Sequence, residues 1–158
     1  MNDFQRTLPQ RNCIRLPAEC YRRGDPFFLT ICTQGRAPVI IGEVRELIAG
    51  FLRRQSADNA GAAFGWVLMP DHVHVLLHGA SDAVQWVRGF KSAVTSTLRR
   101  KNVTGFAWQR SFHDRGIRKN DRLDDVALYL LENPVRAGLC AWFDQWPWSY
   151  VAGVKKAG

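Results

Sequence analysis

The sequence lacks the features that mark secreted, disulfide-stabilised and membrane-spanning proteins. Its four cysteines, Cys13, Cys20, Cys32 and Cys140, include no C-x-x-C pair, and the N-terminus has no apolar segment of the kind that forms a secretory signal. No apolar run reaches the ~18 residues that a membrane-spanning helix needs, and no internal repeat is visible. We therefore expect a cytoplasmic protein with reduced thiols, no membrane partner and no structural zinc site built on cysteine.

Acidic residues are also scarce, because 14 Asp and Glu stand against 22 Lys and Arg, which leaves a net charge of +8. This balance favours a polyanionic partner, nucleic acid first and an anionic membrane surface second. A chain of 158 residues suits one domain. The hydrophobic share of 46% and the six tryptophans indicate a packed core rather than disorder.

Two histidines interrupt the apolar stretch WVLMPDHVHVLL at 66–77. Successive side chains of a strand point to opposite faces, so His72 and His74 share one face with Leu76 and His78. Neutral imidazole is a common ligand of divalent metals, and this pair is pre-oriented by the strand. The alternative is two histidines satisfied by ordinary hydrogen bonds, because His-x-His is frequent by accident.

Hydrophobic periodicity predicts one mixed domain with an N-terminal arm. The expected elements are a strand at 27–33, a helix at 43–56, strands at 64–69 and 72–77 around a Pro70-Asp71 turn, a helix from Ser81 or Asp82, a strand pair or a strand with an extended loop within 106–119, and a helix starting near Asp121. Pro134 should end or bend that last helix at Asn133. We interpret 1–26 as a basic arm, 27–150 as the domain and 151–158 as a tail. We expect the aromatic stretch at 140–153 to form a lid on the core without a catalytic role.

Two basic segments are candidate DNA-binding surfaces. The first is the polar face of the helix after residue 81, with Arg88, Lys91 and Arg99, which either is simply solvated or follows a phosphate backbone. The second is 106–119, where rings suited to stacking on unpaired bases stand among cations. Its candidates are Trp108, Arg110, Phe112, His113, Arg115, Arg118 and Lys119. The alternative is that Trp108 and Phe112 belong to the core.

Tyr129 and Asn133 lie ~40° apart around the last helix, at the border of its apolar stripe, where side chains can face a cleft against the sheet. With these residues and the strand histidines, the chain resembles the single-tyrosine HUH transposases, in particular the branch of REP-associated tyrosine transposases. The matching stretches are FFLT, VLMPDHVHVLL, WQRSFHDRGIR, YLLENPVRAGL and WPWSY. The combination of His-hydrophobic-His with a downstream Y-x-x-x-N-P-V-x-x-G-L is specific, although the first motif alone is not.

The resemblance implies an α+β fold of the HUH endonuclease type, with a ferredoxin-like antiparallel sheet and helices packed on it. It also implies that His72, His74 and Asn133 are metal ligands and that Tyr129 is the nucleophile. Mixed nitrogen and oxygen ligands suit Mg2+ or Mn2+. The expected partner is single-stranded DNA with a hairpin, of the kind formed by repetitive extragenic palindromes. We expect this chain to be a nucleoid-associated bacterial protein, and we favour a monomer over a homodimer.

The chemistry is self-consistent, because a phenol of pKa ~10 is a weak nucleophile at neutral pH and needs a Lewis acid at the phosphate. Attack would give a 5′-phosphotyrosine and a free 3′-hydroxyl, which conserves the ester for rejoining. Two other functions remain open from the residues alone: a nucleic-acid-binding module without chemistry, and a metal-dependent phosphodiesterase that uses water. The lack of a second tyrosine beside Tyr129 disfavours the two-tyrosine replication initiators.

Overall fold

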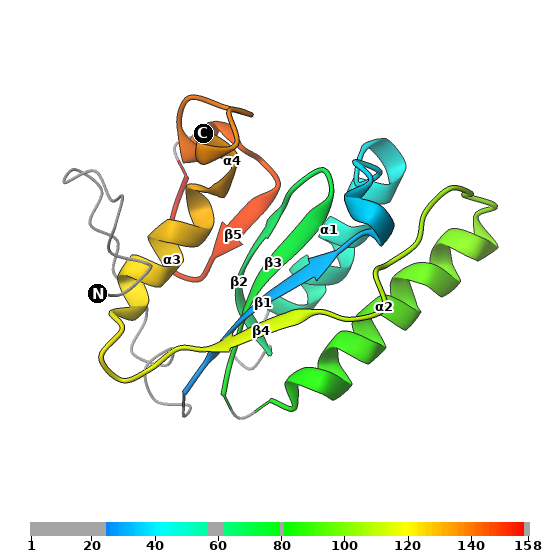
Figure 1. The fold of residues 1–158 in the computed structure, drawn as a ribbon. Helices are drawn as coiled ribbons and strands as arrows, with labels where there is room; N and C mark the ends of the chain where they lie inside the picture. Colours follow the sequence, from blue (N-terminus) through cyan, green and yellow to red (C-terminus); the bar gives the residue numbers. More distant parts are fainter. Residues whose placement is uncertain (1–24, 57–61, 80, 157–158) are drawn as a thin grey trace.

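A computed structural model describes residues 25–56, 62–79 and 81–156, and within them the chain forms a five-stranded antiparallel sheet in the order β4-β1-β3-β2-β5 (Figure 1). The strands are β1 (Phe27–Cys32), β2 (Ala63–Leu68), β3 (His72–Leu77), β4 (His113–Gly116) and β5 (Ser149–Val151). The predicted α+β architecture with an antiparallel sheet is thereby confirmed.

Helices cover both faces of this sheet, so the molecule has three layers (Figure 1). The helices are α1 (Gly42–Ser56), α2 (Ala83–Arg100), α3 (Leu123–Leu131) and the short α4 (Asn133–Arg136), with 3-10 turns η2 (Gln34–Arg36) and η3 (Phe143–Gln145). α1 and α2 pack on one face, and α3 packs on the other. No helix in the described ranges is both long enough and apolar enough to cross a membrane.

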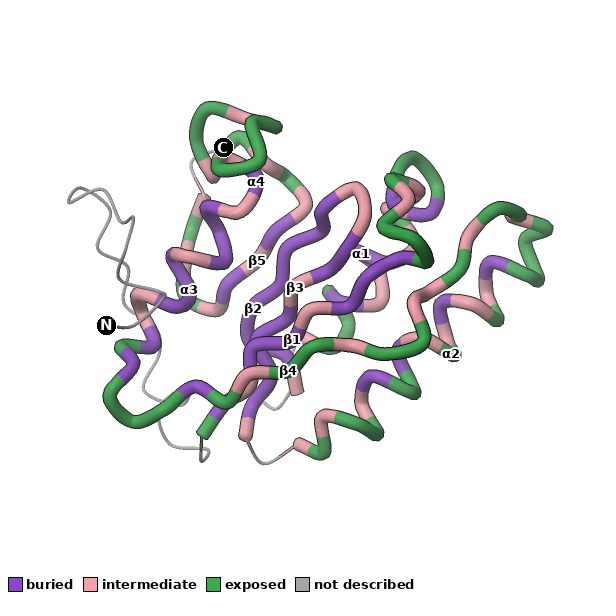
Figure 2. Tube along the Cα trace, viewed as in Figure 1, coloured by how far each residue is buried: buried purple, intermediate pink, exposed green. Residues whose placement is uncertain are grey.

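The alternation of side chains along the strands produces two separate cores. Leu29, Ile31, Val73 and Val75 pack under α1 and α2, whereas Phe28 belongs to the core under α3. The central strands are therefore buried from both sides, as Figure 2 shows. Because His72 and His74 alternate with the two valines, they lie on the α3 face, in agreement with the predicted facing.

The predicted helices form close to the expected positions. Asp82 caps α2 by accepting a hydrogen bond from the Gln85 backbone N–H at 3.0 Å, as expected for an N-terminal carboxylate. The buried stripe of α2 is Val87, Phe90, Val94 and Leu98, whereas Ala83 at its start is only half-buried. α3 begins two residues later than predicted, because the Asp121 carboxylate accepts from the Arg118 backbone N–H in a turn before the helix.

Pro134 bends the last helix instead of ending it. α3 stops at Leu131, and the chain resumes as α4 from Asn133. Proline has no N–H, so the Leu130 carbonyl loses its usual partner four residues ahead. The Asn133 side-chain amide replaces that donor, with Nδ2 3.1 Å from the Leu130 carbonyl oxygen and 3.1 Å from that of Tyr129.

Three sequence-based expectations need correction or fall outside the described residues. The aromatic stretch at 140–153 does more than cover the core, because Ser149–Val151 adds an edge strand that pairs with β2. Trp142 in the same stretch remains 66% exposed. Within 106–119 only His113–Gly116 is a strand, and the rest is an extended segment with one bridge, between Trp108 and Thr33. The arm predicted at 1–26 lies outside the described residues up to residue 24.

Candidate active site

The two strand histidines converge on one point. The Nε2 atoms of His72 and His74 lie 3.0 Å apart, with the rings edge to face at 4.5 Å between centroids. Each ring is held at its other nitrogen: His72 Nδ1 donates to Asp71 Oδ1 at 2.6 Å, and His74 Nδ1 lies 2.9 Å from Thr30 Oγ1. This arrangement fixes both rings with Nε2 directed at a shared position, as in metal sites where the second nitrogen is hydrogen-bonded.

Asp71 is itself held by a cation. Arg36 Nε lies 2.8 Å from Asp71 Oδ2, so a chain of contacts runs from Arg36 through the carboxylate to His72. Arg36 has a φ of +56°, which non-glycine residues adopt rarely, and it also donates to Cys32 Sγ at 2.9 Å. Asp71, Arg36 and Thr30 are not among the site residues predicted from the sequence. Of the three, only Asp71 carries a local signal, because it directly precedes His72.

Burial keeps the histidine pair neutral. It lowers the pKa of His74 to about 3, and the charges of His72 and Arg136 lower that pKa further. A hydrogen bond with the Leu29 backbone opposes the shift. Burial also lowers the pKa of His72, although its hydrogen bond to Asp71 opposes the shift. Neutral imidazole is the form that binds metals, so the site favours ligation at neutral pH.

Tyr129 reaches the same sheet face from α3. Its ring lies 6.1 Å from the ring of Phe28, and the Phe28 ring lies 5.0 Å from that of His74. The Phe28 ring therefore contacts both Tyr129 and His74. Tyr129 is half-buried, as expected for a residue at the border of the apolar stripe.

Asn133 is oriented by the helix bend. Its NH2 group donates to the carbonyls of Tyr129 and Leu130, which accept only, so the amide oxygen Oδ1 must point the other way. The charge of Arg136, three residues later, contributes to the lowered pKa of His74, after burial and the charge of His72. The amide oxygen of Asn133 stays the candidate third ligand that the resemblance to the HUH transposases implies.

The available donors fit a hard divalent cation. No group of three or more His, Cys, Asp and Glu residues suited to a metal occurs in the part of the chain that the structure describes. The candidate donors are therefore the two imidazoles and the amide oxygen that the resemblance to the HUH transposases assigns. Mixed nitrogen and oxygen ligands suit Mg2+ or Mn2+.

The candidate DNA-binding residues fall into two groups. Lys91, Arg99, Trp108 and Arg110 line a groove of about 440 Å³ between α2 and the segment 103–110. Lys91 is held there by the carbonyl oxygens of Gln109 at 2.7 Å and of Ser111 at 3.0 Å, and burial lowers its pKa. Trp108 also packs on the Phe90 ring at 5.7 Å, so it belongs partly to the core.

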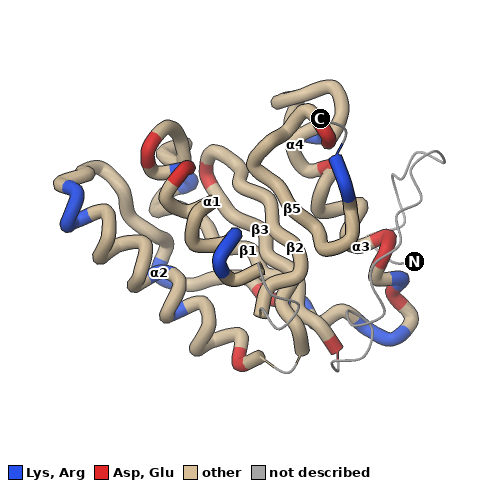
Figure 3. The backbone as a smooth tube through the Cα atoms, turned by 180° about the vertical axis from the view of Figure 1, so that it is seen from behind, with Lys and Arg blue, Asp and Glu red and all other residues tan. Residues whose placement is uncertain are grey.

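The second group lies along the β4 edge. His113 and Arg115 are paired with Thr30 and Phe28 of β1, and opposed residues of antiparallel strands share a face, so both lie on the face of the histidine pair. Arg118 and Lys119 are exposed in the turn before α3, one of the basic segments visible in Figure 3. Arg88 is exposed on α2, and Phe112 packs against the core beneath α1 and α2.

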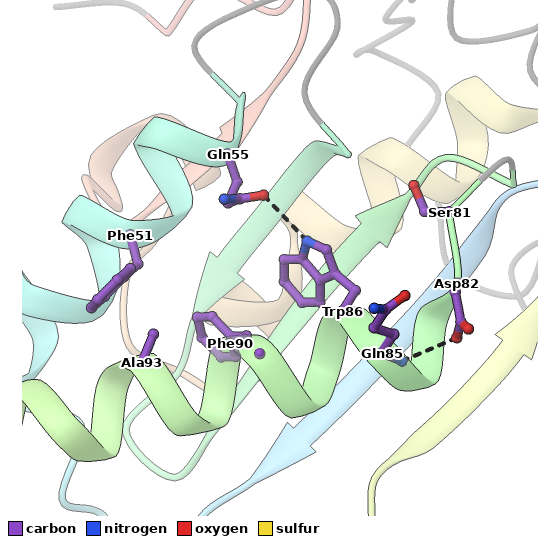
Figure 4. A pocket seen from close by; sticks show the side chains of 9 residues that line it. Phe51, Gln55, Ser81, Asp82, Gln85, Trp86, Phe90 and Ala93 are labelled. Atoms are coloured by element: carbon purple, nitrogen blue, oxygen red, sulfur yellow. Dashed lines mark hydrogen bonds between the residues drawn. The ribbon is translucent and has the colours of Figure 1, made fainter.

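A cavity of about 390 Å³ lies between α1 and α2, on the face opposite the histidines (Figure 4). It is lined by the rings of Phe51, Trp86 and Phe90, and Trp86 Nε1 donates to Gln55 Oε1 at 3.4 Å. None of the predicted site residues lines this cavity.

Comparisons with known proteins identify the family and the fold. The model of the family described as IS200-like transposases matches residues 27–133. The REP-associated tyrosine transposase of Escherichia coli (strain K12) is 24% identical over 132 residues, which cover 82% of this chain and 78% of that protein. A solved structure of a REP-associated tyrosine transposase bound to a REP hairpin shares the fold, with a TM-score of 0.60, 21% identity, and coverage of 90% of this chain and 81% of that one.

Proposed function

The chain belongs to the IS200-like transposase family, and on this premise we propose that it is a metal-dependent endonuclease and strand transferase acting on single-stranded DNA through Tyr129. The observation that carries the proposal is the convergence of the Nε2 atoms of His72 and His74 at 3.0 Å, on the sheet face that the tyrosine helix covers. A phosphodiester placed between that pair and Tyr129 would meet both a cation site and a nucleophile.

The residues would divide the reaction as follows. The phenolic oxygen of Tyr129 forms a bond to phosphorus while the bond to the 3′ oxygen breaks, so the products are a 5′-phosphotyrosine and a 3′-hydroxyl that takes up the proton lost by the phenol. Mg2+ or Mn2+ held by His72, His74 and Asn133 would supply the Lewis acid that neutralises charge on the phosphate. Asp71 and Thr30 keep the two imidazoles in place.

The proposed substrate is a DNA hairpin with an unpaired flank. The solved relative is bound to a REP hairpin, and two features of this chain suit such a substrate. Cations line the groove beside α2 and the β4 edge, and such cations bind phosphates of paired or unpaired strands. The rings of Phe106 and Trp108 in the same groove suit stacking on unpaired bases.

The decisive experiment is a covalent adduct assay with a labelled hairpin oligonucleotide and Mn2+. Wild-type protein should form an adduct that survives denaturation, and Tyr129→Phe should form none while its hairpin affinity and unfolding temperature stay near those of wild type. Tyr150→Phe is the matched control, because Tyr150 stacks on Trp66 in the other core at 6.2 Å between centroids.

The three functional classes give different outcomes. DNA cleavage without an adduct would replace this proposal with a phosphodiesterase that uses water. Binding with neither cleavage nor adduct would leave a nucleic-acid-binding module. Loss of the adduct in Tyr150→Phe but not in Tyr129→Phe would show that the nucleophile is assigned to the wrong residue.

A further inference from the structure

The guanidinium of Arg136 lies on the ring of Tyr129. Its Cζ atom is 3.9 Å from the ring centroid, a cation–π geometry, and its Nη2 donates to the Tyr129 carbonyl oxygen at 2.7 Å. One side chain from α4 therefore contacts both the face of the ring and the backbone of the same residue in α3. The bend at Pro134 determines this contact, because it sets the direction in which α4 leaves α3.

The position of Arg136 is itself fixed from a second side. Its Nη1 lies 3.7 Å from Glu132 Oε2, one helical turn earlier, and Glu132 is only 9% exposed. The Tyr129 ring also meets the Phe28 ring edge-on, at an interplanar angle of 63°. The ring of the proposed nucleophile thus contacts both a cation that is itself paired and an aromatic side chain of β1.

We propose that Arg136 is a positioning residue that orients the ring of Tyr129 for attack on the phosphodiester. This inference rests on the proposed function and adds to it a residue that acts through the nucleophile. The planar guanidinium is required because it stacks on the ring while it also donates to a carbonyl. The ammonium of a lysine has the same charge but no plane to stack, so it would keep the attraction for DNA and lose the orientation.

The test separates charge from shape by comparing Arg136→Lys with Arg136→Gln. We expect Arg136→Lys to lower the single-turnover rate of adduct formation at saturating DNA by about 10–100-fold, because a small misplacement of a reacting group costs that much. Its hairpin Kd and the salt dependence of that Kd should equal those of wild type. Arg136→Gln should reduce the rate of adduct formation to the same extent, and it should also change the salt dependence of the hairpin Kd.

A matched control is available on the far side of the sheet. Arg54 lies over the Phe51 ring at 4.7 Å, an exposed cation–π pair of the same kind on α1. Arg54→Gln removes the same charge and the same type of contact, and its rate of adduct formation should equal that of wild type. All rates are measured well below the unfolding temperature of each variant, and if Arg136→Gln does not fold, the lysine variant decides the question.

Each outcome bears on one of the two proposals. An adduct rate of Arg136→Lys within about twofold of wild type would overturn the positioning role alone. A loss of rate at subsaturating DNA that disappears at saturation would overturn it too, because it would make Arg136 a DNA-binding cation. Failure of the wild-type protein to form any adduct would overturn both this inference and the proposed function.

Discussion

The imidazoles of His72 and His74 face each other through Nε2 at 3.0 Å, and each is held by a hydrogen bond at Nδ1. The carboxylate of Asp71 accepts the Nδ1 proton of His72, which leaves the Nε2 lone pair of neutral His72 directed at the shared position. On the other ring, Nδ1 of His74 lies 2.9 Å from Thr30 Oγ1, and His74 also has a hydrogen bond with the Leu29 backbone. Both rings are therefore oriented by hydrogen-bonding partners, in the way that a pair of metal-binding imidazoles requires.

Metal binding is the first prediction. Wild-type protein should bind Mn2+ in a calorimetric titration, and EDTA should abolish cleavage until Mg2+ or Mn2+ is added back. His72→Ala and His74→Ala should each lose both properties, because each removes one of the converging nitrogens. His78→Gln is the control, since His78 packs on Phe64 at the end of the same strand. Full cleavage by His72→Ala in metal-free buffer would contradict the site.

Asp71→Asn tests whether the hydrogen bond from His72 to the Asp71 carboxylate is needed for metal binding. The amide keeps the shape of the carboxylate but loses its charge and its ion pair with Arg36, so it should orient His72 less firmly. We expect Mn2+ affinity to fall by about 10–100-fold, the usual effect of losing such a partner. Asp82→Asn is the matched control, because asparagine caps a helix as well as aspartate does. An unchanged Mn2+ affinity in Asp71→Asn would show that the ion pair is only structural.

The local parts of this site were predictable from the sequence, and the non-local parts were not. Alternation along one strand suffices to place His72 and His74 on a common face, and the bend follows from Pro134 alone. The partnership of His74 with Thr30 depends on the register of β1 against β3, which joins residues 44 positions apart. No short-range pattern contains that register.

The edge of the sheet shows the same limit. β5 contains three residues, Ser149–Val151, too few for an alternating pattern to distinguish a strand from a loop. From the sequence, Lys91 is indistinguishable from the exposed cations of α2. It donates to backbone carbonyls only because the segment 109–111 passes beside that helix in the folded chain. Arg136 likewise gains its contact with Tyr129 from a bend whose angle the sequence does not specify.

Asn133→Asp should lower the thermal stability of the protein, even though a carboxylate is a stronger ligand for a hard cation than an amide. The variant loses the N–H donors to the Tyr129 and Leu130 carbonyls. The Tyr129 carbonyl still accepts from Arg136 Nη2, but the Leu130 carbonyl loses its replacement donor, at a cost of about 1–3 kcal/mol. We therefore expect the unfolding temperature to fall by about 2–10 °C. Pro134→Ala restores a backbone N–H for Leu130, so the penalty of Asn133→Asp should be smaller in that background. Equal penalties in both backgrounds would contradict the proposed role of the amide.

Lys91 and Arg99 should behave differently although both line the α2 groove. Lys91→Gln removes the donor that holds the carbonyls of 109–111, so it should lower the unfolding temperature and the hairpin affinity together. Arg99 is exposed, and Arg99→Gln should leave stability unchanged while reducing the slope of log affinity against log salt by about 1 per lost phosphate contact. Thermal unfolding and fluorescence anisotropy with a labelled hairpin distinguish these cases. A Lys91→Gln variant as stable as wild type would contradict the structural role.

The form of the DNA is the last prediction. The basic, ring-lined groove lies beside α2, and the histidine pair lies on the α3 face. The segment 106–112 followed by β4 connects the two at the β4 edge of the sheet. A strand that uses both surfaces must turn around that edge, which unpaired nucleotides do readily and a stiff duplex does not.

One oligonucleotide is therefore compared as a hairpin with a single-stranded flank, as a linear single strand, and as a complete duplex, at one fixed ionic strength. The hairpin should be cut fastest, the linear strand more slowly because it lacks the paired stem, and the duplex least. The advantage of the hairpin should shrink in Arg99→Gln and remain in Arg54→Gln, because only the first of these residues lines the groove. Cleavage of the duplex at a rate equal to that of the hairpin would refute the turn around the edge and favour a water-using phosphodiesterase.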